Sequence, residues 1–159
     1  MAESNQEAPA RDSRDCSMER LEIEQYPRVS KKPIRTYSKR EVGIQGELIA
    51  AHSCELRGYE LLDRNWHCRW GEADIIALEG DTLVLIEVKT RIDFGGEKGV
   101  EPEVSVDASK LGRYRSISLA YLIEHPQYFA IRFDVIAVTI VDENQASLHH
   151  LVNVYCWED

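Results

Sequence analysis

The clearest pattern of hydrophobic and polar positions is a pair of consecutive β-rich runs, residues 72–79 and 82–91, each with an apolar stretch at its centre and joined by a Gly-Asp dipeptide. Gly followed by a polar residue is a favoured two-residue turn, so we predict that these runs pair as an antiparallel β-hairpin. Counting back from the turn places Asp74 opposite Glu87. Opposed residues point to the same face of a sheet, with Cβ atoms about 5 Å apart. The pattern therefore brings two carboxylates together.

Helical patterns flank this hairpin. Ser38 and Glu41 have the spacing of a capping box, and an apolar stripe follows them as far as Gly58. A second helix is predicted over residues 107–124, where a His-Pro pair ends it. Shorter β-rich runs predict strands at residues 59–64, 130–141 and 147–155, and residues 92–106 are predicted to be a loop. This order, α-β-β-β-α-β-β, predicts an α/β fold with a mixed central sheet flanked by helices.

Residues 1–37 have a different composition, with many charged residues, Ser and Pro and no sustained periodicity. We predict a disordered N-terminal tail over 1–37 and a folded domain over 38–159. A run of Lys and Arg residues lies where the two meet. A solvated linker is the simpler interpretation of that run, and an arm that contacts a polyanion is the alternative.

Composition and charge limit the partners of the chain. Its 159 residues suffice for one domain with a core, and its four Cys residues form no CxxC pair. Neither a membrane span nor a secretory signal is recognisable, which favours a cytoplasmic protein. The net charge of −9 argues against a broadly basic nucleic-acid surface. Binding to a polyanion would need a local basic patch or a bound cation.

The candidate chemistry lies on the hairpin. Lys89 is two residues from Glu87 and shares its face with Asp74. Facing carboxylates repel each other, and a divalent cation such as Mg²⁺ or Mn²⁺ would compensate them, with the carbonyl oxygen of Val88 as a further ligand. Such a site suits the hydrolysis of phosphodiester bonds by an activated water. The alternative is a surface ladder of charges in which Lys89 only pairs with its acidic neighbours.

Several sequence blocks make the prediction more specific. The segments G-E-L-I-A at 46–50, R-N-W at 64–66, G-E-A-D at 71–74 and E-V-K-T-R at 87–91 resemble the YraN family. This largely uncharacterised bacterial family is related to archaeal Holliday-junction resolvases and restriction endonucleases. The resemblance implies a restriction-endonuclease-like αβββαβ core of the PD-(D/E)xK superfamily. One departure is Ala73, which stands where the superfamily motif has Pro.

The resemblance also implies roles for individual residues. Asp74 and Glu87 would be metal ligands and Lys89 the catalytic lysine. Glu47 would be the additional acidic residue of the site, and a solvent-facing helix charge is the alternative for it. The catalytic set is then Asp74, Glu87, Lys89 and Glu47, and the metal set is Asp74, Glu87 and Val88.

Three basic residues are candidates for contacts with nucleic acid: Arg91, Lys110 and Arg113. A phosphate contact and a lysine that extends above a core stripe are both compatible with the position of Lys110. Solvation on the surface is the alternative for the two arginines.

Three functions fit these observations, and one of them is an interaction module whose charges only bind a partner protein. The other two involve nucleic acid. The first is a Mg²⁺-dependent endonuclease that hydrolyses DNA, on branched or damaged structures. The second is a non-catalytic nucleic-acid-binding or repair-scaffold domain that keeps the nuclease fold. Resolvase-like proteins are often dimers, so a homodimer is a further expectation by analogy.

Overall fold

The computed structural model describes residues 18–95 and 107–154. Its elements follow in the order β1 (Glu19–Glu22), a short 3-10 helix η1 (Ile34–Thr36), α1 (Lys39–Leu56), β2 (Glu60–Cys68), β3 (Gly71–Glu79), β4 (Thr82–Ile92), α2 (Ala108–Glu124), β5 (Ala130–Ile140) and β6 (Gln145–Leu151). Apart from β1 and η1, this is the predicted order of elements. No helix of the described part is long and apolar enough to cross a membrane.

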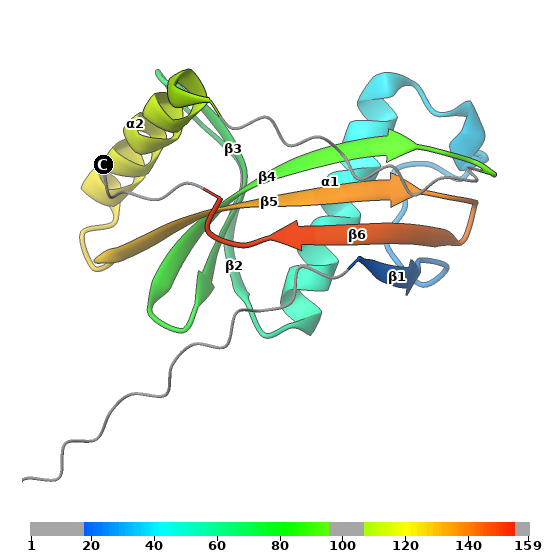
Figure 1. Ribbon diagram of the computed structural model, residues 1–159, viewed down its shortest axis with the longest axis horizontal. Helices are drawn as coiled ribbons and strands as arrows, with labels where there is room; N and C mark the ends of the chain where they lie inside the picture. The colour runs from blue at the N-terminus through cyan, green and yellow to red at the C-terminus, as the bar shows by residue number, and fades with distance from the viewer. Residues whose placement is uncertain (1–17, 96–106, 155–159) are drawn as a thin grey trace, which may run out of the picture.

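One mixed sheet organises the fold. Its strand order is β1-β6-β5-β4-β3-β2, and β4 and β5 are parallel whereas the other neighbouring pairs are antiparallel (Figure 1). The parallel pair is joined through α2, as a parallel connection requires a crossover. The structure therefore confirms the predicted α/β fold with a mixed central sheet, consistent with a restriction-endonuclease-like core.

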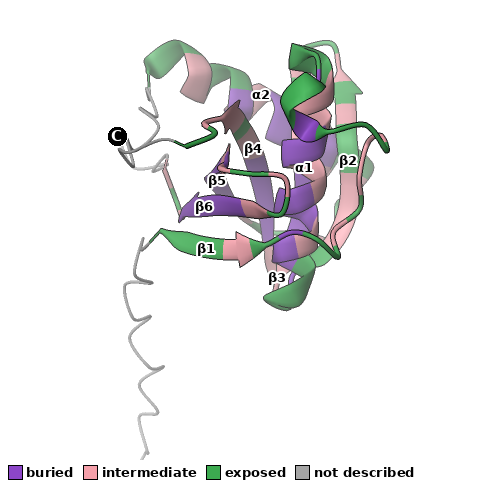
Figure 2. Cartoon of the chain, turned by 90° about the vertical axis from the view of Figure 1, so that its right-hand side faces the viewer, coloured by how far each residue is buried: buried purple, intermediate pink, exposed green. Residues whose placement is uncertain are grey.

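The two helices cover opposite faces of the sheet. Val84 and Ile86 of β4 pack in one apolar cluster with the inner side of α1, whereas Leu83 and Leu85 pack in a second cluster with α2. Buried residues accordingly fill the central strands and the sheet-facing side of α1, while β1 is largely exposed (Figure 2). A central strand that is apolar on both faces is typical of a parallel pair between helices.

Local sequence signals set the helix boundaries. Ser38 caps α1 by accepting a hydrogen bond from the backbone N–H of Glu41, whose carboxylate accepts one from the N–H of Ser38. Asp107 caps α2 in a similar way through the N–H of Lys110 at 2.8 Å. The predicted capping box and both predicted helices are confirmed. Most of the predicted loop at 92–106 lies outside the described residues, as does the end of the strand predicted to reach residue 155.

The predicted domain boundary at residue 38 is wrong. β1 pairs with β6, and Ile23 and Ile34 are fully buried in the cluster under α1. Residues 18–37 are therefore part of the fold, and residues 1–17 of the predicted disordered tail lie outside the described part. Local patterns do not reveal this segment because it has few apolar residues, without periodicity. Its strand partner lies more than a hundred residues further along the chain.

Candidate functional site

The hairpin of β3 and β4 separates at the predicted site. Among the described residues, its antiparallel ladder runs from Glu79 opposite Thr82 to Ile75 opposite Ile86, as the turn predicted, and ends there. At the next position, Oδ2 of Asp74 accepts a hydrogen bond from the backbone N–H of Val88 at 2.8 Å. The side chain of Asp74 thus lies in the fork between the two strands.

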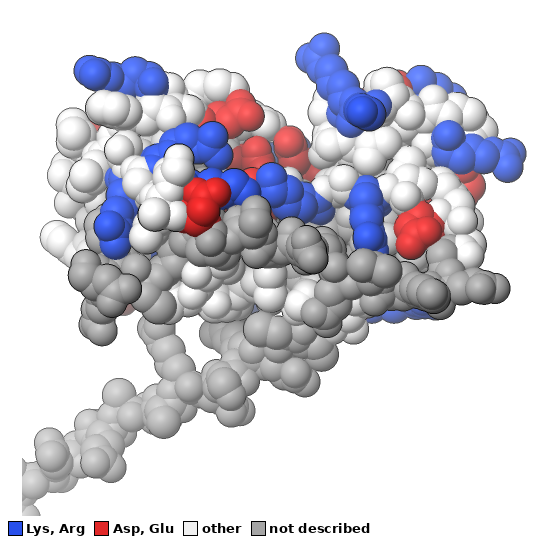
Figure 3. Space-filling model, turned by 45° about the horizontal axis from the view of Figure 1, so that its top comes forward, with Lys and Arg blue, Asp and Glu red and all other residues white. Residues whose placement is uncertain are grey.

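Asp74 and Glu87 line one pocket. It has a volume of about 360 Å³ and lies between the hairpin and α2, and its other lining residues are His67, Cys68, Gly71, Glu72, Arg113 and Tyr114. Figure 3 shows acidic side chains in a hollow on this side of the molecule, with Lys and Arg side chains around it. The pocket therefore combines a carboxylate floor with basic surroundings.

Glu87 is held by two donors. Its Oε1 lies 2.5 Å from Nζ of Lys89, and its Oε2 accepts a hydrogen bond of 2.5 Å from the hydroxyl of Tyr114. Burial alone would raise the pKa of Glu87. The hydrogen bonds from Lys89 and Tyr114, with the charges of Lys89 and Lys110, outweigh burial and hold that pKa below its ordinary value. Glu87 is therefore ionised at neutral pH.

Asp74 has the opposite shift. Burial raises the pKa of its carboxyl from 3.8 to about 6, and the neighbouring carboxylates of Glu47, Glu87 and Glu72 raise it further against the lowering effect of the Val88 N–H. The two carboxyl groups therefore differ in charge below about pH 6, because Glu87 is ionised there whereas Asp74 keeps its proton. Around Asp74, burial and the acidic neighbours together oppose ionisation.

Close packing of α1 on β4 places Glu47 within electrostatic reach of Asp74. A Cβ built on Gly46 would lie 2.6 Å from the Cβ of Thr90 and closer still to its hydroxyl oxygen, so only glycine permits this approach. The half-buried Glu47 follows directly in the helix and helps to raise the pKa of Asp74. It does not line the pocket itself.

The three predicted nucleic-acid contacts differ in position. Arg113 lines the pocket, and Lys110 lies close enough to lower the pKa of Glu87. Arg91 lies beyond the pocket on β4, and its Nε donates to Oγ1 of Thr139 on β5 at 3.1 Å. The structure thus brings two of the three basic residues to the carboxylates.

The donor set of the pocket fits a hard cation. In the part of the chain that the structure describes, no group of three or more His, Cys, Asp or Glu side chains is arranged to hold a metal. Two carboxylates that share a pocket nevertheless suit Mg²⁺, which binds oxygen ligands and commonly keeps several of its waters. Asp74 and Glu87 would hold it, with the carbonyl of Val88 as the predicted third protein ligand.

Two features of the site escaped sequence reasoning. Tyr114 falls at helical spacing with Lys110, which indicates a common face but not a hydrogen bond to Glu87. His67 and Glu72 are paired across β2 and β3, with Nε2 and Oε2 2.8 Å apart at the mouth of the pocket. No local sequence signal links residues of α2 to the hairpin.

A second charged cluster lies on the α1 face of the same sheet. Arg132 and Asp134 are two residues apart on β5, and this spacing predicts an ion pair on one face. The structure confirms it, because Nε and Nη2 of Arg132 donate to the two carboxylate oxygens of Asp134, each at 2.8 Å. Nε2 of His150 lies 2.8 Å from Oδ2 of the same carboxylate, and the N–H of Asn153 donates to Oδ1 at 2.9 Å. Neighbouring residues on a strand point to opposite faces, so we expect one of His149 and His150 to face solvent and the other to be buried, but both are buried.

Comparisons with known proteins agree with the motifs. The model of the Uncharacterised protein family UPF0102 matches residues 46–138. A UPF0102 protein of Syntrophomonas wolfei subsp. wolfei is 35% identical over 119 residues, which cover 73% of this chain and 98% of that protein. One from Paenarthrobacter aurescens is 40% identical over 117 residues, covering 71% and 92% respectively. The chain therefore belongs to the UPF0102 family, also called the YraN family, as its sequence blocks predicted.

Proposed function

We propose that this protein is a Mg²⁺- or Mn²⁺-dependent endonuclease that hydrolyses phosphodiester bonds in DNA, in the cytoplasm. One observation supports this most strongly. Asp74 and Glu87 share a pocket in which burial and the neighbouring carboxylates raise the pKa of Asp74 to about 6. Perturbed carboxylates gathered in a cleft are typical of functional sites, and a divalent cation is the simplest compensation for them.

The residues around the pocket suit the reaction. A bound Mg²⁺ would withdraw charge from the phosphate and acidify a water molecule. In hydrolysis, the water oxygen attacks phosphorus, the bond to one sugar oxygen breaks, and that oxygen takes up a proton. Lys89 carries a positive charge on the face of Glu87 and would stabilise the charge that develops on the phosphate. Tyr114 keeps Glu87 ionised and oriented, and Arg113 would contact a neighbouring phosphate.

One observation favours the second candidate, a nucleic-acid-binding scaffold without activity. Both carboxylate oxygens of Glu87 already have protein partners, Lys89 and Tyr114. A metal would need at least one of these oxygens. Metal binding therefore separates the two functions before any substrate is known.

Calorimetric titration of Mn²⁺ into the wild type, Asp74→Asn and Asp81→Asn tests the proposal. Asp81 lies exposed in the hairpin turn, so its substitution removes the same charge outside the pocket. We expect heat of binding for the wild type and Asp81→Asn, and none for Asp74→Asn. Cleavage of branched, single-stranded and duplex DNA is then measured with the same three proteins. Absence of Mn²⁺ binding by the wild type, with DNA present as well, would favour the scaffold.

A further inference from the structure

An unusually basic segment lies just before and at the start of α1. Residues 28–40, called the basic strap below, contain six Lys and Arg residues and no Asp or Glu. The whole chain has a net charge of −9, so the rest of the chain has a net charge of −15. The strap also lies outside residues 46–138, which the family model matches. It is the local basic region that an acidic protein needs to approach a polyanion.

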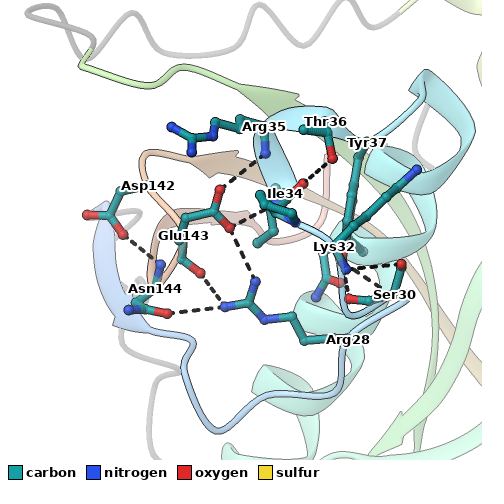
Figure 4. Close-up of polar contacts among 12 residues, drawn as sticks. Arg28, Ser30, Lys32, Ile34, Arg35, Thr36, Tyr37, Asp142, Glu143 and Asn144 are labelled. Atoms are coloured by element: carbon teal, nitrogen blue, oxygen red, sulfur yellow. Dashed lines mark hydrogen bonds and ion pairs between the residues drawn. The ribbon is translucent and has the colours of Figure 1, made fainter.

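The turn between β5 and β6 fixes the basic strap in place. The carboxylate of Glu143 accepts hydrogen bonds from the backbone N–H groups of Ile34 and Arg35, at 2.8 and 3.4 Å (Figure 4). The guanidinium of Arg28 reaches Glu143 and also Oδ1 of Asn144, the latter at 3.2 Å. The strap is therefore tied to a turn more than a hundred residues away in sequence.

The first helix holds the strap from its other side. The side chain of Gln45, which is buried in α1, accepts from the N–H of Val29 at 3.0 Å and donates to the carbonyl of Pro27 at 2.9 Å. The side chain of Ile34 is fully buried beneath the strap. These contacts fix the backbone, so binding through the strap loses little conformational entropy.

The charged groups of the strap are available for binding. Lys32 pairs with Glu41 at 2.9 Å, and Arg28 pairs with Glu143. Within the described residues, the other four basic side chains make no ion pair, and all four are exposed: Lys31, Arg35, Lys39 and Arg40. Four solvated cations on a fixed backbone form a surface suited to phosphate groups.

The end of the basic strap, at the start of α1, lies across the acidic hollow from α2. In Figure 1, α2 lies at the upper left of the view and the start of α1 at the upper right, and Figure 3 shows Lys and Arg side chains on both sides of the acidic hollow. Along α1, Lys39 precedes Glu47 by eight residues, or about 12 Å at 1.5 Å per residue. A separation of about 12 Å is small enough for one nucleic-acid duplex to contact the end of the strap and also cover the pocket.

From this placement we infer that the basic strap binds the backbone phosphates of DNA and forms the second wall of a cleft whose first wall is α2 with Lys110 and Arg113. The inference rests on the proposed function, in which the pocket acts on DNA. Segments that bind a lipid surface combine basic with exposed apolar side chains. The large exposed apolar residues of the described part, such as Trp70 and Ile123, all lie outside the strap, which favours a nucleic acid over a membrane.

Fluorescence anisotropy with a labelled DNA duplex tests the inference, in buffer without a divalent metal and over a range of salt concentrations. We expect the variant K31Q/R35Q/K39Q/R40Q to bind at least about tenfold more weakly than the wild type. The slope of log K against log salt should become shallower by roughly 0.9 for each phosphate that the variant no longer binds. Arg20→Gln, an exposed arginine on β1, is the control for Arg35→Gln because it removes the same charge elsewhere.

A second variant tests the fixed position of the strap. Glu143→Ala removes a negative charge, so charge alone predicts tighter binding to DNA. Loss of the strap's anchor predicts weaker binding instead, and we expect the latter, with circular dichroism confirming that the variant folds.

Each outcome decides the inference. Equal affinity and salt slope for wild type and K31Q/R35Q/K39Q/R40Q would overturn it, as would equal effects of Arg35→Gln and Arg20→Gln. Unchanged or tighter binding by Glu143→Ala would overturn the fixed strap. Loss of binding to anionic phosphatidylserine vesicles, but not to DNA, would assign the strap to a membrane. DNA binding that depends on the strap without cleavage would support the strap and refute only the nuclease.

Discussion

Two carboxylates of the same sheet, Asp134 and Asp74, have opposite surroundings. Asp134 receives a bidentate arginine, a histidine and a backbone N–H, and these outweigh its burial and lower its pKa. Asp74 receives one backbone N–H and faces three other carboxylates, and burial with their charge raises its pKa. The charge of Asp134 is compensated within the chain, whereas the partners of Asp74 do not outweigh its burial and its acidic neighbours. A buried charge that the fold compensates stabilises the structure, whereas a carboxyl with a raised pKa in a pocket is typical of a functional site.

The largest expected effect comes from breaking the compensated cluster. Asp134→Ala leaves Arg132 buried without its main partner, and the free energy of unfolding should fall by about 3–5 kcal/mol. Urea denaturation measures this, with Asp81→Ala in the exposed turn as the control. Arg132 also contacts Glu79 at 2.6 Å and the hydroxyl of Tyr59 at 3.0 Å. A loss below about 1 kcal/mol would mean that these two partners alone compensate its charge.

A bound divalent cation should stabilise the pocket that holds Asp74 and Glu87. At a Mn²⁺ concentration of about a hundred times Kd, the wild type should gain about 2.7 kcal/mol against unfolding, because only the folded state holds the site. Asp74→Asn should gain none, and without metal it should be at least as stable as the wild type. Differential scanning calorimetry with and without EDTA records both. An equal rise in Tm for the two proteins would place the ion elsewhere.

The two carboxylates should give stability an opposite dependence on pH. Asp74 ionises near pH 3.8 when unfolded and near pH 6 when folded, so its contribution to stability falls as pH rises through that window, by on the order of 1–2 kcal/mol. Asp134 has a lowered folded pKa, so its contribution is lost as pH falls below the ordinary range of Asp. Urea denaturation of Asp74→Asn and wild type, in EDTA, should therefore differ at pH 7 and converge below pH 4. A constant difference across this range would contradict the raised pKa.

The smallest effect is expected for the hydroxyl that holds Glu87. Tyr114→Phe removes one hydrogen bond that keeps the carboxylate of Glu87 ionised. Mn²⁺ affinity and the cleavage rate should therefore each fall by about tenfold, corresponding to about 1.4 kcal/mol. The pH at which Glu87 ionises should also rise, and the acid limb of the pH–rate profile should move with it. Tyr128→Phe on the loop after α2 is the matched control. Identical pH profiles for the two variants would make Tyr114 a packing residue only.

The sequence predicts the parts of this fold that depend on neighbouring residues. The Gly80-Asp81 turn determines the pairing of Ile75 with Ile86, and Ser38 with Glu41 determines the start of α1. From these, the proximity of Asp74 and Glu87 follows by counting. Local rules are reliable here because each joins residues a few positions apart.

Contacts between distant segments were beyond such reasoning. The pairing of β1 with β6, the hydrogen bond from Tyr114 to Glu87 and the burial of both His149 and His150 each depend on tertiary packing. The polar composition of residues 18–37 indicated disorder because two buried isoleucines among many charges leave no periodic pattern. Their stability comes from partners that no local window contains.

The anchoring of the basic strap by Glu143 has a consequence for synthesis of the chain. The strap leaves the ribosome early, but the carboxylate that holds it is made more than a hundred residues later, and β6, the partner of β1, follows that turn. A domain generally folds as a unit, so its early segments wait for the partners that are synthesised later. Here the first described strand must wait for the last. A nascent chain that ends before residue 143 should therefore have a protease-sensitive strap, and completion of β6 should protect it.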